Sequence, residues 1–139
     1  MRLPSAASEL KEAVDGPDGF VLEAPFTSMR EEVSTFKIAK VFNYFINVDK
    51  LIIDSDLSFD NEHWIKDVKT PLFILHSEDD GVIPFELGRK LYEIALKHSV
   101  KVKFYPFARK CGFGHDNIYK CDTLSSIMGE IVSIVHEHK

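Results

Sequence analysis

Residues 71–84 read PLFILHSEDDGVIP, and this stretch decides the fold. Its apolar run has the length of a buried strand and ends in paired acids, Asp79 and Asp80. Pro84 then suits the first turn of a helix, where its missing N–H costs nothing. The stretch therefore predicts a strand at Leu72–His76, an acidic turn and a helix. The expected buried stripe of that helix consists of Leu87, Leu91, Ile94 and Ala95.

A second apolar run and a glycine-rich loop follow this helix. Val100–Phe107 predicts another strand, and residues 111–117, CGFGHDN, predict a loop that carries His115. Asp122 or Thr123 is expected to cap a last helix. The expected apolar face of this helix comprises Leu124, Ile127, Met128, Ile131, Val132 and Val135. Strands that alternate with helices predict a parallel sheet with right-handed crossovers.

The first half of the chain is expected to add one strand and a helical insert. Phe20–Ala24 predicts a short buried strand, preceded by a helix at Ser5–Val14. A capping box at Ser28–Glu31 begins an insert of about residues 26–66, which ends in a short helix at Asn61–Val68. Three strands are few for a parallel sheet, which is normally larger and covered on both faces. Residues 1–139 thus predict one partial α/β domain, the C-terminal part of a larger one.

Composition excludes several classes of function. The 139 residues carry a net charge of −5, which argues against nucleic acid as a partner. No run of about 18 apolar residues predicts a membrane span, and no signal peptide is evident. Cys111, His115 and Cys121 match no common zinc spacing and have no evident fourth ligand, so no metal is expected.

The candidate site follows from the topology. In open parallel sheets, ligands bind beyond the carboxyl ends of the strands, and Glu23, the acid pair and His115 all follow strand ends. A histidine can transfer a proton at neutral pH when a carboxylate fixes its tautomer. Asp80 stands four positions before Pro84, and this spacing favours Asp80 over Asp79 as the partner of His115. The order strand–acid, then strand–histidine, is that of the last two members of an α/β-hydrolase triad.

Other interpretations of these residues stay open. Asp80 could only cap a turn while His115 lies on the surface, or Asp79–Asp80 could hold Mg²⁺ or accept a phosphoryl group. Gly112-Phe113-Gly114 lacks the third glycine of a dinucleotide loop, because Asn117 stands there. Of the remaining histidines, His76 is expected to pack at a strand end, His63 and His98 lie on expected helices, and His136 and His138 lie in an expected terminal tail.

Three segments resemble the α/β-hydrolase domain-containing protein 12 family: residues 22–32, 71–80 and 84–92. The likeness extends over about residues 20–134. It implies the C-terminal part of an α/β-hydrolase fold and a serine hydrolase that cleaves lipid esters, of the lysophosphatidylserine and monoacylglycerol lipase type, without a cofactor. By this resemblance Asp80 is the triad acid and His115 the base. Cys111 and Gly114 depart from the pattern expected for the family.

The same resemblance places important parts outside this sequence. The nucleophilic serine, the oxyanion loop and a membrane-spanning segment of the endoplasmic reticulum membrane would precede Met1. No Gly-x-Ser-x-Gly motif occurs in the 139 residues. The chain is therefore expected to be part of an enzyme. The alternative is a catalytically inactive, hydrolase-like remnant that acts as a binding module, and a nucleophile motif upstream of Phe20 would discriminate between the two.

Overall fold

The computed structural model describes residues 17–28 and 60–138. The helix expected at Ser5–Val14 and most of the insert expected at residues 26–66 lie outside the described residues. The division into one partial domain with such an insert stays a prediction.

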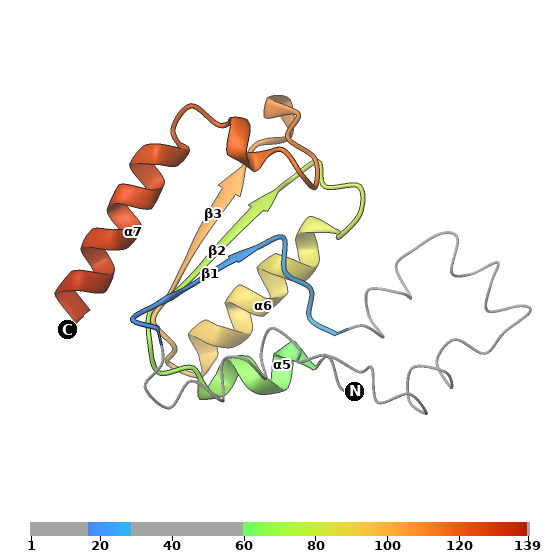
Figure 1. Ribbon diagram of the computed structural model, residues 1–139. Helices are drawn as coiled ribbons and strands as arrows, with labels where there is room; N and C mark the ends of the chain where they lie inside the picture. The colour runs from blue at the N-terminus through green and yellow to red at the C-terminus, as the bar shows by residue number, and fades with distance from the viewer. Residues whose placement is uncertain (1–16, 29–59, 139) are drawn as a thin grey trace, which may run out of the picture.

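The described residues form a three-stranded parallel sheet in the order β1-β2-β3 (Figure 1). The strands are β1 (Phe20–Glu23), β2 (Leu72–Ser77) and β3 (Val102–Phe107). Leu22 pairs with Ile74 of the central strand, and Ile74 pairs with Phe104 on its other side. All six residues of β2 are buried, as expected for a parallel strand covered on both faces. The predicted strands and their parallel arrangement are confirmed, but the expected burial of the first strand is wrong. β1 lies at the edge of the described sheet, and its residues alternate between partly buried and exposed.

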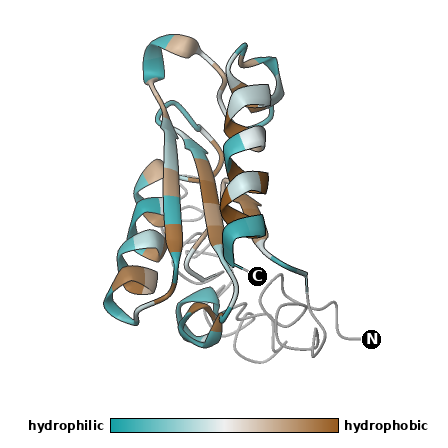
Figure 2. Ribbon diagram, turned by 90° about the vertical axis from the view of Figure 1, so that its left-hand side faces the viewer, coloured by the Kyte–Doolittle hydropathy of each residue, from teal (hydrophilic) through white to brown (hydrophobic). Residues whose placement is uncertain are grey.

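Helices cover the two faces of the sheet. α6 (Phe85–Lys97) lies on one side of the strands and α7 (Leu124–His138) on the other (Figure 2). A short helix, α5 (Asn61–Trp64), and a 3₁₀ turn, η1 (Ile65–Asp67), pack beside α6, where Glu62 pairs with Lys90 at 2.7 Å. Two further 3₁₀ turns, η2 (Arg109–Cys111) and η3 (Ile118–Lys120), lie between β3 and α7. The predicted helix after the acidic turn is confirmed, with Pro84 as its N-cap.

Side chains of β2 alternate between the two layers of the core, because successive residues of a strand point to opposite faces. Leu72 and Ile74 pack with Leu91 and Ala95 of α6. Phe73 and Leu75 pack with Ile131 of α7 on the other face. The strand carrying the acidic turn is thus fixed from both sides.

The last helix differs from its sequence pattern in two respects. Met128 and Val132 are 39% and 51% exposed, whereas Ile134 packs against the core. The six apolar positions span a wider arc of the helix than the sheet can cover, so those at its edge stay outside. The expectation of a terminal tail was also wrong, because His136 and His138 lie in the last turn of α7.

The described residues contain neither a membrane-spanning helix nor a cluster of metal-binding side chains. No helix within residues 17–28 and 60–138 has the length and apolar character needed to cross a bilayer. Nor do three or more histidine, cysteine or acidic side chains gather there in a group that could hold a metal ion.

Candidate active site

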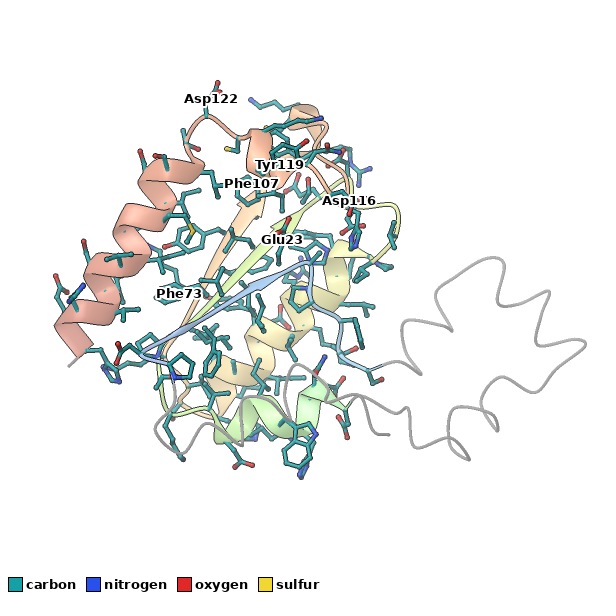
Figure 3. The ribbon with its side chains drawn as sticks, in the orientation of Figure 1. Glu23, Phe73, Phe107, Asp116, Tyr119 and Asp122 are labelled. Carbon is teal, nitrogen blue, oxygen red and sulfur yellow. The ribbon has the colours of Figure 1, made fainter. Side chains whose placement is uncertain are left out.

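The carboxyl ends of the three strands meet at one edge of the sheet. Figure 3 shows Glu23 at the end of β1 on the same edge as Phe107, which ends β3, and Asp116 of the following loop. Two segments build the candidate site there: the acid turn, residues 77–84 after β2, and the histidine loop, residues 108–123 after β3. Because β2 and β3 are hydrogen-bonded neighbours, their parallel register brings the two segments together.

Asp80 is fixed by backbone groups of its own turn. Its side chain is fully buried, and its Oδ1 accepts hydrogen bonds from the N–H groups of Val82 at 2.8 Å and Ile83 at 2.9 Å. Aspartate commonly closes turns in this way by bonding the backbone two residues on. The second oxygen, Oδ2, is thereby aimed away from the turn and toward the neighbouring loop.

Oδ2 of Asp80 accepts a hydrogen bond from the imidazole of His115. Its Nδ1 lies 2.9 Å from Oδ2 of Asp80, and its side chain is 28% exposed. The hydrogen bond to Asp80 is the main cause that raises the pKa of His115 above its usual value of 6.5. Because Nδ1 bears the proton donated to Asp80, the Nε2 of neutral His115 carries a lone pair that can accept a proton. Oδ1 of Asp116 lies 3.9 Å from Nε2, and the Glu23 carboxylate adds a weaker attraction for the proton.

Asp79 points in another direction, as the spacing predicts. It accepts a hydrogen bond from the hydroxyl of Ser77 at 2.5 Å, and both of its oxygens lie 3.1 Å from the N–H of Gly114. The bond from Ser77 is the main cause that lowers the pKa of the Asp79 carboxyl below its usual value of 3.8. Asp79 therefore positions the backbone immediately before His115, and Asp80 contacts the imidazole itself.

The histidine loop follows a path that requires glycine at two points. Gly112 and Gly114 have φ values of +66° and +57°, in the left-handed region that other residues adopt only at a cost. Buried Ile118 fixes the far side of the loop to the core, and Phe113 packs edge to face on Phe107. The departure from the expected family residue at Gly114 thus has a local structural reason.

The structure also places a residue that the sequence did not assign to the site. His76 is fully buried near the end of β2, and its Nε2 lies 3.3 Å from Oδ2 of Asp80. The sequence signal for this contact is Gly88, a glycine inside a helix. A Cβ added at Gly88 would lie 2.2 Å from Nδ1 of His76, so the helix can approach the imidazole only with glycine there.

Cys111, His115 and Cys121, the three possible zinc ligands in the sequence, lie in different surroundings. Cys111 is exposed in η2, and the Sγ of Cys121 lies 3.1 Å from the hydroxyl oxygen of Thr123. Both cysteines are free thiols. Nδ1 of His115 is hydrogen-bonded to Oδ2 of Asp80.

Known proteins with similar sequences share one family name. The chain is 40% identical over 124 residues to lysophosphatidylserine lipase ABHD12 of Macaca fascicularis, covering 84% of this chain and 31% of that protein. The Danio rerio protein of the same name is 35% identical over 130 residues, covering 88% and 34%. Protein ABHD12B of Homo sapiens is 33% identical over 138 residues, covering 93% and 37%.

Over the matched residues, the chain is similar to the C-terminal portion of the ABHD12 proteins. It spans about a third of the length of these curated relatives. No family model matches the chain. The predicted resemblance is confirmed, and the ABHD12 proteins now provide the context for the site.

Solved structures show the fold. The uncomplexed acylaminoacyl peptidase of Pyrococcus horikoshii aligns with a TM-score of 0.57 at 18% identity, covering 76% of this chain and 18% of that one. A puromycin hydrolase mutant aligns with a TM-score of 0.57 at 18% identity, covering 79% and 16%. The parallel sheet between α6 and α7 is the partial α/β-hydrolase fold that the sequence predicted.

Proposed function

We propose that this chain carries the acid–base pair of a serine hydrolase that cleaves lipid esters, with His115 as the general base and Asp80 as the residue that orients it. The observation that supports this most is the 2.9 Å contact between Nδ1 of His115 and Oδ2 of a buried, backbone-held Asp80. The names of the relatives, lysophosphatidylserine lipase, support a lysophospholipid as substrate. Monoacylglycerol is the second substrate class of the proposal.

The proposed reaction transfers the acyl group in two steps. Nε2 of His115 takes the proton of a serine hydroxyl supplied from outside these 139 residues, while the serine oxygen attacks the ester carbonyl. The glycerol oxygen then leaves with that proton, which gives an acyl-serine. Water, deprotonated by the same nitrogen, attacks the acyl-serine and releases the fatty acid. Asp80 stabilises the imidazolium in both steps, and no metal or cofactor takes part.

The chain by itself is proposed to be unreactive. It contains no Gly-x-Ser-x-Gly motif, which positions the nucleophile in enzymes of this fold. We expect the purified 139-residue chain to leave a serine-directed phosphonate probe unreacted and to hydrolyse no ester above background. Stoichiometric labelling of any of its serines would contradict the proposal.

Turnover of lysophosphatidylserine by the gene product at its full encoded length tests the activity. His115→Ala should lower turnover by about 10⁶-fold, because loss of the general base leaves only binding and oxyanion stabilisation. His98→Ala is the matched control, since His98 is an exposed histidine at the end of α6. An unmodified gene product that binds lipid but neither turns it over nor reacts with the probe would favour the inactive binding module.

The finer part of the proposal concerns location. By resemblance to its family, the complete protein is proposed to meet its substrate at the endoplasmic reticulum membrane, through a segment that lies outside this chain. Fractionation and microscopy of the tagged gene product at its full encoded length test this. Recovery away from that membrane would contradict it.

A further inference from the structure

A second histidine lies beside the proposed pair and contacts the same oxygen of Asp80 as His115 does. His76 is 0% exposed, and its Nε2 lies 3.0 Å from the carbonyl oxygen of Ile83 and 3.3 Å from Oδ2 of Asp80. Both neighbours are hydrogen-bond acceptors. The proton of neutral His76 must therefore be on Nε2, where it can be shared between them.

The other ring nitrogen shows why this tautomer is fixed. Nδ1 of His76 is buried and has no hydrogen-bond partner among the described residues. Gly88 approaches it closely enough that a Cβ there would lie 2.2 Å away. A proton on Nδ1 would be a buried donor without an acceptor, which is unfavourable and more so when the group is charged. The surroundings thus disfavour both the other tautomer and the imidazolium.

The charges around the two imidazoles act in opposite directions. Burial is the main cause that lowers the pKa of His76, although Asp80 opposes it, and His115 lowers it slightly. The carboxylates of Asp80, Asp116 and Glu23 all raise the pKa of His115. Burial thus disfavours the cationic form of His76, and its neutral form, protonated at Nε2, can donate to Asp80.

We propose that His76 is a positioning residue for the reaction proposed above: its Nε2–H shares Oδ2 of Asp80 with the Nδ1–H of His115. The carboxylate is then held from four sides, by two backbone N–H groups at Oδ1 and by two imidazoles at Oδ2. Sharing the oxygen draws part of its negative charge away from His115. His76 thereby keeps His115 less basic than Asp80 alone would make it.

The first test is the tautomer in the unmodified protein. Nitrogen-15 NMR of histidine-labelled gene product at its full encoded length distinguishes the two neutral tautomers from the imidazolium. We expect His76 to remain neutral and protonated at Nε2 from about pH 5 to about pH 8. A proton on Nδ1, or titration of His76 to a cation near its usual pKa of 6.5, would overturn the proposal.

The second test uses two variants of similar volume. His76→Gln keeps an N–H donor near the position of Nε2, whereas His76→Leu removes it. In the Leu variant the pKa of His115 should rise by about half a unit to one unit, since a charged hydrogen bond is lost. In the Gln variant it should stay close to that of the unmodified protein. No rise with Leu, a fall with Leu, or an equal rise in both variants would overturn the proposal. If the Leu variant does not fold, the tautomer measurement decides.

The inference rests on the proposed function, but its failure can be distinguished from a failure of that function. The titration of His115 requires no turnover. If the pKa shifts appear and no ester is hydrolysed, the proposed function fails and the shared carboxylate stands. If lipid is turned over and the pKa of His115 does not respond to His76→Leu, only the role of His76 is wrong. If both the proposed function and the role of His76 are correct, His76→Leu moves the acid limb of the kcat/KM profile to higher pH and leaves KM unchanged.

Discussion

The acid turn and the histidine loop are two segments of one site, yet they are held in different ways. The acid turn holds itself, because Asp80 bonds the N–H groups of Val82 and Ile83 within its own few residues. The histidine loop is held from outside. Glu78 accepts a hydrogen bond from the N–H of Arg109, and Asp79 accepts one from the N–H of Gly114. Asp80 binds the imidazole of His115. Three successive acids of one segment thus fix three points of the other, and their effects on turnover should decrease with distance from the imidazole.

The largest effect is expected at Asp80. In the gene product at its full encoded length, Asp80→Asn should lower turnover of lysophosphatidylserine by about 10⁴-fold, because an amide at this place favours the wrong tautomer of His115. The protein should remain folded, since Asn can still accept from Val82 and Ile83 at its carbonyl oxygen. Near-normal turnover of this variant would show that Asp80 does not orient the base.

A smaller effect is expected at Asp79. Asp79→Asn should lower turnover by about tenfold, through the position of Gly114 and the backbone next to His115. The substitution keeps an acceptor for that N–H but removes the charge. The same lipid assay measures it beside Asp80→Asn. If Asp79→Asn abolishes turnover while Asp80→Asn is tolerated, the assignment of the two acids must be reversed.

The two histidines should give the segments opposite responses to pH. The pKa of His115 is raised, so the stability that it contributes is present below its usual value of 6.5 and is lost as pH rises through its folded pKa. The pKa of His76 is lowered, so its contribution is present above 6.5 and is lost as pH falls through its folded pKa. The joint contribution of the two histidines to the free energy of unfolding is therefore largest near pH 6.5.

Urea unfolding between about pH 5 and about pH 8.5 checks this in the gene product at its full encoded length. Subtracting the His115→Gln curve from that of the unmodified protein should leave a difference that declines on the alkaline side. The corresponding difference for His76→Gln should decline on the acid side. Parallel curves, or slopes of the opposite sign, would contradict the opposed shifts.

The smallest effect is expected at Glu78. Its Oε2 accepts from the N–H of Arg109 at 3.0 Å, but both groups are exposed and water can replace either partner. Glu78→Ala should change turnover by less than about twofold. A loss as large as that of Asp79→Asn would show that the start of the histidine loop matters as much as its middle.

Much of this arrangement could be predicted from the sequence, because turn-forming and helix-starting residues mark the ends of its elements. The paired acids and Pro84 indicate where β2 ends and α6 begins, and the order of the strands predicts that Asp80 lies beside His115. The packing of Met128 and Val132 could not be obtained in this way. A helical period shows which residues are apolar, but the extent of the covering sheet determines which of them are buried.

The contact between His76 and Asp80 does not follow from the sequence pattern. The burial of His76 was expected from its place in an apolar strand, and its burial is confirmed. Its contact with Asp80 depends on the path of the turn that follows and on the approach of Gly88, which is twelve residues away. A glycine inside an otherwise good helix costs about 1 kcal/mol relative to alanine. This unexplained cost was the only trace of the contact in the sequence.

The separation of the contacting residues along the chain has a consequence for folding. The bonds within the acid turn join residues two and three positions apart, whereas those to the histidine loop join residues 31 and 35 apart. Closing a chain segment costs entropy that grows only slowly with its length, by about 0.6 kcal/mol for each doubling, but all of it is lost before the distant contact forms. The turn can therefore order on its own, early and reversibly. The imidazole finds its carboxylate only after α6 has crossed over and β3 has docked on β2, so protection of the Gly114 amide from hydrogen exchange would report completion of the whole crossover.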